Sequence, residues 1–279
     1  MTHGSSAKVT LITGSSRGIG RALALTLARQ GGTVVVNCRK NTGLAHETVE
    51  RIHEAGGRGF AVAADIETTE GVTALFDAVA ERCGRLDHFV SNAAASAFKN
   101  IVDLRAHHLD RSFAMNVRPF VLGAQEAVKL MDRGGRIVGL SSYGSLRAFP
   151  GYAALGAMKA AVESWVRSMA VEFAPYGISV NAVNGGLIDS DSLRFFYGIE
   201  GMPPMRTVFD RIPLGRAGTV QEMADAIAFL LGPGADYITG QTLVVDGGLS
   251  ITAPPFHADA GSALALPPRP TRDDDRAPR

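Results

Sequence analysis

Short apolar runs alternate along the chain with longer segments in which apolar residues recur at helical spacing. The apolar runs predict strands at residues 9–12, 33–37, 59–63, 86–90, 135–140 and 179–183. Between the first four of these, we expect helices over residues 21–30, 46–55 and 72–83. The alternation continues as far as Asp246, which predicts an α/β fold with a parallel sheet covered by helices on both faces.

Two segments interrupt this alternation. Residues 189–213 are long for a loop and carry several large apolar side chains among glycines and prolines, which favours a substrate-covering flap. An irregular packed segment is the alternative interpretation. Residues 253–279 are rich in Pro, Asp, Arg and Ala and have little to bury, so we expect a disordered tail. One domain is therefore predicted over residues 1–252.

Composition supports one large globular domain, because 46% of the 279 residues are hydrophobic and 20% are charged. A net charge of +1 implies no general attraction to nucleic acid or to an anionic membrane. No apolar run approaches the ~20 residues of a membrane span, and residues 1–8 lack the apolar core of a signal peptide. Cys38 and Cys83 lack metal-ligand spacing and fit a reducing compartment, so we expect a cytoplasmic protein without a bound metal.

A glycine-rich turn follows the first predicted strand and reads Thr-Gly-Ser-Ser-Arg-Gly-Ile-Gly over residues 13–20. Glycines let the backbone approach a pyrophosphate, and the amides at the start of the next helix would bind it. At the end of the second strand, where an acid would favour NAD, residues 37–40 read Asn-Cys-Arg-Lys. Arg39, together with Arg17 from the turn, could pair with a 2′-phosphate. We therefore expect NADPH; the alternative is that both arginines are solvated surface charges.

Tyr152 and Lys159 are the leading candidates for acid catalysis. An ammonium near a phenol lowers the pKa of the phenol, which could then protonate a developing oxyanion near neutral pH. Ser142 and Tyr143 stand at the end of a predicted strand, and Asn116 is a polar residue in an apolar helical stretch. The alternatives are that Tyr152 is a packing aromatic and that Asn116 is a satisfied buried amide.

These motifs together resemble the short-chain dehydrogenase/reductases. The resemblance covers about residues 8–249 and rests on the 13–20 turn, Asp65, Asn92-Ala93-Ala94, Asn116, Ser141-Ser142, Tyr152 with Lys159, residues 180–183, 240–242 and 245–248. It implies a Rossmann-type doubly wound sheet, a nicotinamide cofactor, hydride transfer and commonly a homotetramer. The catalytic residues that it implies are Asn116, Ser142, Tyr152 and Lys159. The cofactor-binding residues that it implies are Gly14, Ser16, Arg17, Gly18, Ile19, Gly20, Arg39, Asp65, Ile66, Asn92, Ala93, Lys159, Gly185, Ile188 and Ser190.

Two departures from the common family pattern resemble one subgroup. Most of the family has three residues between the tyrosine and the lysine, but Leu155 occupies that tyrosine position here. Gly185-Gly186 also replaces the usual Pro-Gly. Both features resemble the NADPH-dependent enoyl-acyl-carrier-protein reductases of the FabL type, whose hallmark is a tyrosine, six residues and a lysine. The resemblance implies that Tyr152 stabilises and protonates an enolate, and it leaves the part played by Ser142 open.

The spacing also fits the chemistry of an enoyl thioester. Hydride adds to the β-carbon, and negative charge develops on the thioester oxygen, two carbons beyond the position of a ketone oxygen. If a helix begins near Tyr152, moving the acid there from position 155 shifts it by one turn, about 5 Å. A separation of seven residues still keeps Tyr152 and Lys159 on one face. We therefore expect reduction of an enoyl group carried by acyl carrier protein or coenzyme A, in fatty-acid or specialised acyl metabolism.

Two other functions remain open from the sequence. Tyr143 or Tyr152 could serve a carbonyl reductase of the 3-ketoacyl type in a rearranged site. A non-catalytic nucleotide-binding regulator is the second alternative, and it is disfavoured because the four catalytic candidates occur together.

Overall fold

A seven-stranded parallel sheet forms the centre of the molecule, in the order β3-β2-β1-β4-β5-β6-β9. The computed structural model describes residues 7–132, 134–199 and 204–252. The strands of the sheet are β1 (Val9–Ile12), β2 (Thr33–Cys38), β3 (Arg58–Ala63), β4 (His88–Ser91), β5 (Gly135–Ser142), β6 (Ile178–Gly185) and β9 (Thr242–Val245). A separate pair joins β7 (Ile188–Asp189) to β8 (Gly218–Thr219).

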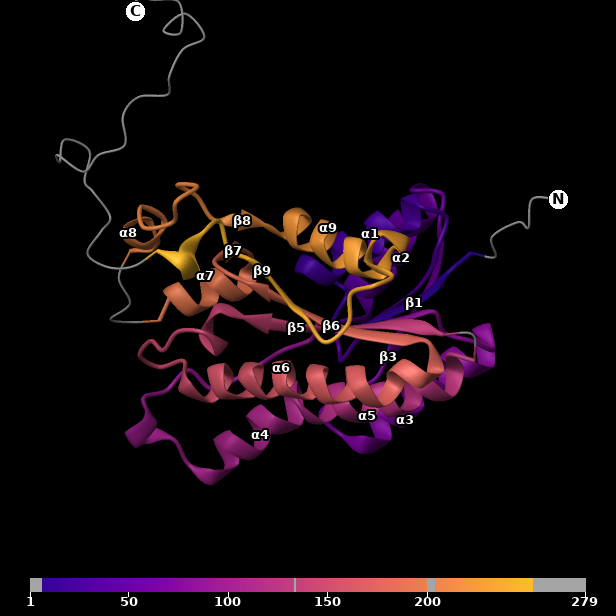
Figure 1. Cartoon of the computed structure of the whole chain (residues 1–279), viewed down its shortest axis with the longest axis horizontal. Helices are drawn as coiled ribbons and strands as arrows, with labels where there is room; N and C mark the ends of the chain where they lie inside the picture. Colours follow the sequence, from indigo (N-terminus) through magenta and orange to yellow (C-terminus); the bar gives the residue numbers. More distant parts are fainter. Residues whose placement is uncertain (1–6, 133, 200–203, 253–279) are drawn as a thin grey trace, which may run out of the picture.

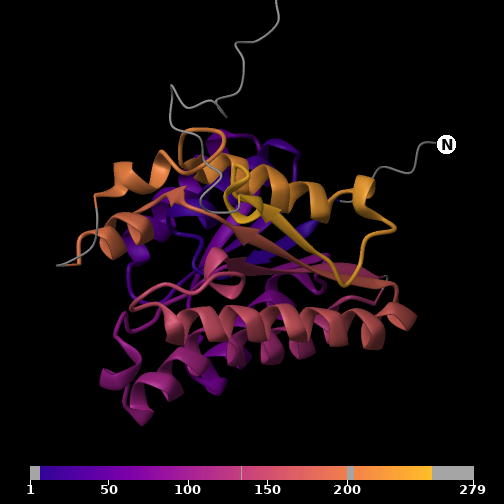
Figure 2. The ribbon, with the colours of Figure 1, turned by 60° about the vertical axis from the view of Figure 1, so that its left-hand side comes forward.

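Helices cover both faces of the sheet (Figure 1). One layer contains α1 (Gly18–Arg29), α2 (Thr42–Glu54) and α9 (Val220–Leu231). The other contains α3 (Thr69–Cys83), α5 (Arg118–Leu130) and α6 (Ala153–Phe173), with α4 (Ala106–Asn116) packed on α5 and α6. Figure 2 shows the sheet between these layers from a second side. The predicted α/β fold with a parallel sheet is confirmed.

Short 3-10 helices lie in the connections between the strands and the helices. They are η1 (Ile101–Asp103), η2 (Tyr143–Ser145), η3 (Ala174–Tyr176), η4 (Pro233–Ala235) and η5 (Leu249–Ile251). Among the helices of the described residues, none combines the length and the apolar character that crossing a membrane requires.

The apolar runs form strands because both faces of the sheet are covered. Every residue of β1, β4 and β6 is buried, as expected for central parallel strands between two helical layers. On α6 the buried residues recur every three or four positions and include Leu155, Lys159, Val162 and Val166. Lys159 therefore lies on the helix face that packs against the sheet.

The predicted strands lie within two residues of the observed ones, but the predicted helices begin too late. α2 begins at Thr42 because the Asn41 side chain accepts a hydrogen bond from the Leu44 amide. α3 begins at Thr69 because the Thr68 side chain accepts one from the Gly71 amide. Such N-caps satisfy amides that the first turn leaves unpaired, so they extend a helix ahead of its apolar stripe.

Residues 189–213, expected to form a substrate-covering flap, contain helical structure. Two helices, α7 (Asp191–Tyr197) and α8 (Met205–Phe209), occupy much of the described part. Ser190 begins α7, because its Oγ accepts a hydrogen bond from the Leu193 amide at 3.4 Å. Phe196 is buried, so α7 packs against the rest of the fold, and the covering of a substrate by this segment stays a prediction. The predicted disordered tail, residues 253–279, lies outside the described residues.

The strand order reverses between β1 and β4, since β2 and β3 lie on one side of β1 while β4, β5 and β6 follow on the other. In open parallel sheets a ligand crevice forms at such a switch point, outside the carboxyl ends of the strands. The segments that follow β1 to β6 all begin at this edge. The fold therefore brings the predicted site residues to one edge of the sheet.

Asn37, at the end of β2, ties the glycine-rich turn to the neighbouring strands. Its Oδ1 accepts a hydrogen bond from the Gly14 amide at 3.2 Å. Its Nδ2 donates to the carbonyl oxygens of Val62 at 3.3 Å and Ala64 at 3.2 Å. Because the Asn37 side chain is buried, removing it would leave several backbone groups without a hydrogen-bond partner and without access to water.

We expect Asn37→Ala to lower the free energy of unfolding by about 2–4 kcal/mol, the range for breaking a buried hydrogen-bond network. Asn41→Ala is the matched control, because it removes an exposed helix cap and should cost about 1 kcal/mol. Chemical denaturation of both variants measures the difference. A loss for Asn37→Ala no larger than the loss for Asn41→Ala would contradict the role given to Asn37.

Candidate active site

The glycine-rich turn lies against the end of β4. Gly14 has φ of 62°, and a Cβ on it would lie 2.9 Å from the Cβ of Ala93. A Cβ on Gly20 would lie 2.8 Å from the Nδ2 of Asn92, which donates to the Thr13 carbonyl oxygen at 2.8 Å. Larger residues at either glycine would therefore separate the turn from β4.

The start of α1 fits the pyrophosphate of a dinucleotide. Among the residues that the structure describes, no side chain caps α1 and its first turn contains no acid. Gly18 has φ of 58°, and no described atom lies within 4 Å of the position of a Cβ there. Free amides at the positive end of the helix dipole favour an anion. The predicted residues Gly14, Ser16, Gly18, Ile19 and Gly20 are therefore brought together around an anion-binding helix terminus.

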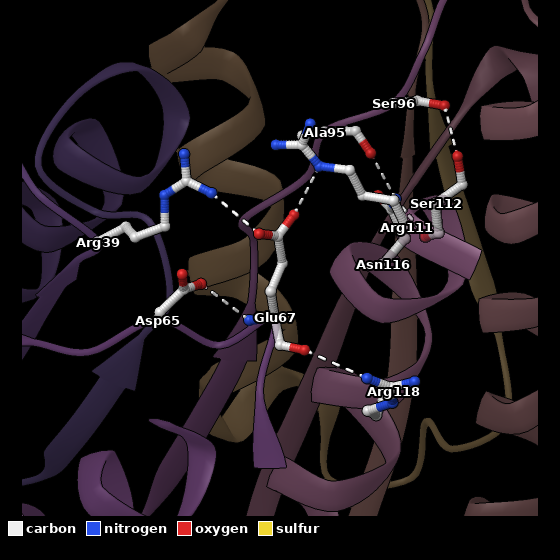
Figure 3. Close-up of polar contacts among 9 residues, drawn as sticks. All are labelled: Arg39, Asp65, Glu67, Ala95, Ser96, Arg111, Ser112, Asn116 and Arg118. Carbon is white, nitrogen blue, oxygen red and sulfur yellow. Dashed lines mark hydrogen bonds and ion pairs between the residues drawn. The ribbon is translucent and has the colours of Figure 1, made fainter. Parts of the chain in front are cut away.

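The two arginines expected near a 2′-phosphate both have acidic partners. Arg39 pairs with Glu67 at 3.0 Å, and Arg17 pairs with Asp191 at 3.8 Å. Figure 3 shows Arg39 and Asp65 on the same side of Glu67, with Arg111 on the other side. The Oδ1 of Asp65 accepts a hydrogen bond from the Glu67 amide at 3.1 Å. Ile66, predicted to bind cofactor, is buried between them in the chain. Glu67 was not singled out from the sequence, because it follows β3 whereas its partner Arg39 follows β2.

Tyr152 and Ser142, two of the predicted catalytic residues, contact each other. Tyr152 is the N-cap residue of α6, and its hydroxyl donates to the Oγ of Ser142 at 3.4 Å. Ser142 is the last residue of β5 and lies opposite Gly185 of β6. Leu155, at the position of the usual tyrosine, is buried with 7% of its surface exposed. Burial raises the pKa of the Tyr152 phenol, while the hydrogen bond with Ser142 acts to lower it.

The position of Lys159 corrects one expectation. Its Nζ donates to the Leu140 carbonyl oxygen at 2.7 Å, two residues before Ser142 on β5. Burial lowers the pKa of Lys159 from its ordinary 10.5 to about 8. The pKa of Tyr152 is raised and not lowered, so the expected effect of the ammonium on the phenol is wrong for this structure. The physical reason is that burial of the phenol raises its pKa by more than the hydrogen bond with Ser142 lowers it.

Asn116 fastens the chain that follows β4 to α4. Its Nδ2 donates to the Ala95 carbonyl oxygen at 2.7 Å and to the Ser112 carbonyl oxygen at 2.8 Å (Figure 3). The hydroxyls of Ser96 and Ser112 lie 3.0 Å apart. Within the described part of the chain, the buried Oδ1 of Asn116 has no hydrogen-bond partner. The amide is thus half-satisfied, and its free oxygen is an acceptor suited to a bound ligand or water.

The remaining predicted cofactor residues follow β6. Gly185 ends β6, Ile188 is buried in β7 opposite Gly218, and the Ser190 hydroxyl caps α7. All three stand on the connection that leads from the sheet edge into α7. The structure thus places them together, and the Ser190 hydroxyl, expected to bind the cofactor, accepts a hydrogen bond from the Leu193 amide.

Two glycines that the sequence reasoning missed allow Tyr152 to approach β5. A Cβ on Gly144 would overlap the ring of Tyr152, and a Cβ on Gly156 would overlap the Gly144 carbonyl oxygen. Their separations from Tyr152 were a signal available in the sequence, because Gly156 lies one helical turn after Tyr152. The ring therefore packs on η2, directly beyond Ser142.

Glu163 is a second residue that was missed. Its Oε1 accepts hydrogen bonds from Ser141 at 2.5 Å, Ser145 at 2.7 Å and the Nδ2 of Asn184 at 2.9 Å. These donors come from β5, η2 and β6, so one carboxylate joins the strand ends beneath the site. Glu163 lies one helical turn after Lys159, which places both polar groups on the sheet-facing side of α6.

Aromatic rings surround the phenol. The ring centroid of Tyr152 lies 4.3 Å from that of Phe149, 5.5 Å from that of Phe98 and 5.4 Å from that of Phe196. Phe149 also stacks on Tyr143, with centroids 6.4 Å apart. Tyr152 further borders a surface cavity of about 620 Å³, whose lining includes residues 100–102 and 144–153. The phenol therefore stands in an apolar setting beside a space of ligand size.

The sequence is similar to those of known reductases. The family model described as enoyl-(acyl carrier protein) reductase matches residues 14–250. The 1-cyclohexenylcarbonyl-CoA reductase of Streptomyces collinus is 81% identical over 266 residues, which cover 95% of this chain and 95% of that protein. A hydroxynaphthalene reductase-like protein of Metarhizium robertsii is 36% identical over 251 residues, covering 86% of this chain and 94% of that protein.

Solved structures share the fold. A short-chain dehydrogenase/reductase from Serratia marcescens has a TM-score of 0.82 at 31% identity, covering 89% of this chain and 100% of that chain. An NADPH-dependent reductase involved in bacilysin biosynthesis has a TM-score of 0.83 at 26% identity, covering 88% of this chain and 98% of that chain. The chain therefore belongs to the short-chain dehydrogenase/reductase family, in the part that the enoyl-(acyl carrier protein) reductase model describes.

Proposed function

We propose that this chain uses NADPH to reduce the carbon–carbon double bond of an enoyl thioester of coenzyme A in specialised acyl metabolism. The observation that carries the proposal is the phenol of Tyr152, which lies beside Ser142 while the usual tyrosine position holds the buried Leu155. The 81% identity to 1-cyclohexenylcarbonyl-CoA reductase supports the same substrate class. Acyl carrier protein remains the alternative carrier.

The bound cofactor would supply hydride to the β-carbon of the substrate. In our proposal the amides at the start of α1 bind its pyrophosphate, Arg39 and Arg17 bind its 2′-phosphate, and Asp65 with Ile66 borders its adenine. Lys159 is proposed to hold the ribose hydroxyls at the nicotinamide end. Ile188 and Ser190 would hold the carboxamide. The uncapped helix terminus and the free Oδ1 of Asn116 support a bound polar ligand along this edge.

Tyr152 would act on the thioester oxygen. As hydride reaches the β-carbon, the electron pair of the double bond moves toward that oxygen, and the phenol donates a hydrogen bond or its proton to the enolate. Burial raises the phenol pKa, so the group keeps its proton through the neutral range. Ser142 would accept from or donate to the same hydroxyl and so fix its direction.

The surroundings of Tyr152 suit an apolar acyl group. Phe98, Phe149 and Phe196 offer ring faces and edges, and they exclude water from the developing charge. Phe196 belongs to α7, so the segment at 189–213 would still cover the substrate, although it does so as a helix. We propose that the acyl group lies among these rings.

A carbonyl reductase is the second candidate, because Tyr143 directly follows Ser142 in the chain and the ring of Tyr143 stacks on Phe149. NADPH oxidation with enoyl-, 3-ketoacyl- and cyclohexenylcarbonyl-CoA, each also tested on acyl carrier protein where possible, separates the two functions. Turnover of the keto substrate alone would overturn the proposed enoyl reduction. NADPH binding without turnover of any thioester would favour the regulator.

We further propose a cytoplasmic homotetramer. The exposed apolar residues include Leu109, Phe113 and Trp165 on α4 and α6, which pack on each other, and Phe229, Leu243 and Val244 on α9 and the edge strand β9. Two separate self-complementary faces on one subunit build a tetramer with dihedral symmetry, and burying them removes the unpaired edge of the sheet.

Tyr152→Phe tests the acid. We expect kcat with the preferred enoyl-CoA to fall about 100-fold or more, because positioned proton donors contribute about 10²–10⁴-fold, while the Kd for NADPH stays unchanged. Tyr143→Phe is the matched control and should retain activity within about threefold. Stopped-flow and steady-state kinetics measure both variants. Activity of Tyr152→Phe equal to that of the wild type would assign the proton to another group.

Lys159 predicts a pH dependence of stability for the cofactor-free protein. Its pKa of about 8 in the fold lies below its ordinary 10.5, so between these values the unfolded chain binds more protons than the folded chain. The contribution of Lys159 to the free energy of unfolding therefore rises as pH increases from about 8 to 10, by at most about 3 kcal/mol. Denaturation of wild type and Lys159→Met across this range measures the difference. A difference that is flat with pH would contradict the burial of a titrating ammonium.

A further inference from the structure

Glu67 lies at the centre of an ion-pair network beside the end of β3. Its Oε2 is 3.0 Å from the Nη1 of Arg39, and its Oε1 is 3.0 Å from the Nε of Arg111. Figure 3 shows the two guanidinium groups approaching the carboxylate from opposite sides, one from the end of β2 and one from α4. Both carboxylate oxygens are thus occupied by arginines from separate parts of the fold.

The position of Glu67 is fixed through its backbone. Its amide donates to Asp65, and its carbonyl oxygen accepts a hydrogen bond from the Nη1 of Arg118 at 3.3 Å. The side chain of Glu67 is 19% exposed, compared with 41% for Arg39 and 67% for Arg111. The carboxylate is therefore the anchored member of the network, and Arg39, like Arg111, is more exposed and freer to respond to a ligand.

This arrangement affects any phosphate that Arg39 receives. The guanidinium already serves one anion, so a 2′-phosphate would bring a second anion next to a fixed carboxylate. Repulsion between like charges opposes that binding, and Arg111 offsets it because it neutralises part of the charge on Glu67. NADH carries no 2′-phosphate, so the charge on Glu67 would have little effect on the binding of NADH.

We propose that Glu67 is a specificity-determining residue that limits the preference of this chain for NADPH over NADH, by restraining Arg39 and opposing the 2′-phosphate. The inference rests on the proposed use of NADPH with Arg39 at its phosphate. A purely structural role, in which the network only joins the segment after β3 to α4, would change the binding of both cofactors alike.

Binding measurements on the full chain test the proposal without any turnover. Calorimetric or fluorescence titration gives the Kd for NADPH, NADH and adenosine 2′,5′-bisphosphate, which carries the phosphate but no nicotinamide. The isosteric variant Glu67→Gln keeps both backbone hydrogen bonds. We expect it to bind NADPH and the bisphosphate about fivefold more tightly and to change the Kd for NADH by less than about twofold.

Arg111→Gln should change the Kd for NADPH in the opposite direction to Glu67→Gln. It leaves Glu67 less neutralised and more firmly paired with Arg39, so we expect NADPH to bind about fivefold more weakly. Glu126→Gln is the control, because it also removes one acid of a surface pair, with Lys129 on α5, and it should leave all three Kd values unchanged. High ionic strength should shrink the effects of both network variants.

The proposal is overturned if Glu67→Gln changes the Kd for NADPH and NADH by the same factor, or if it weakens NADPH. Thermal unfolding of each variant with and without ligand provides a check that the chain is folded. If the wild type binds NADH at least as tightly as NADPH, the proposed cofactor is contradicted. The role of Glu67 is tested separately, by the change that Glu67→Gln makes to the ratio of the two Kd values.

Discussion

The close contact between the backbones of Gly144 and Gly156 governs the position of the whole catalytic end of the fold. With no side chain on either residue, the first turn of α6 lies directly against η2 and the end of β5. That approach places the Tyr152 ring over Gly144 and its hydroxyl beside Ser142. It also sends Lys159, two turns along, onto the Leu140 carbonyl oxygen. A displaced helix would misplace all of these groups together, because they are carried by one rigid element.

Much of the fold was accessible from the sequence because the central strands β1, β4 and β6 are local, largely apolar runs that the helical layers bury completely. The site edge was accessible for a related reason: motifs that follow parallel strands meet at one end of the sheet. Helix starts were less accessible, since Asn41 and Thr68 extend α2 and α3 beyond their apolar residues. The helices within residues 189–213 were missed because α7 and α8 are shorter than the window over which helical periodicity can be detected.

The site shows the same division between local and long-range information. The pair Tyr152 and Ser142 could be predicted because both stand at element ends that the fold brings together. The pairing of Arg39 with Glu67 could not, since it depends on where two strand ends and α4 converge. The pKa of Tyr152 was predicted in the wrong direction because the count of nearby residues along the chain says nothing about desolvation, which dominates at a ring surrounded by phenylalanines. Glu163 was overlooked because its partners come from three different elements.

The rings around Tyr152 come from three separate stretches of chain: Phe98 follows β4, Phe149 precedes α6, and Phe196 belongs to α7. None of these three residues forms part of the central sheet or of the glycine-rich turn. Replacing one of these rings would therefore change the space beside the Tyr152 phenol, while Tyr152 and the glycine-rich turn keep their positions. Under the proposed function, single substitutions at these rings would change which acyl group fits without displacing Tyr152.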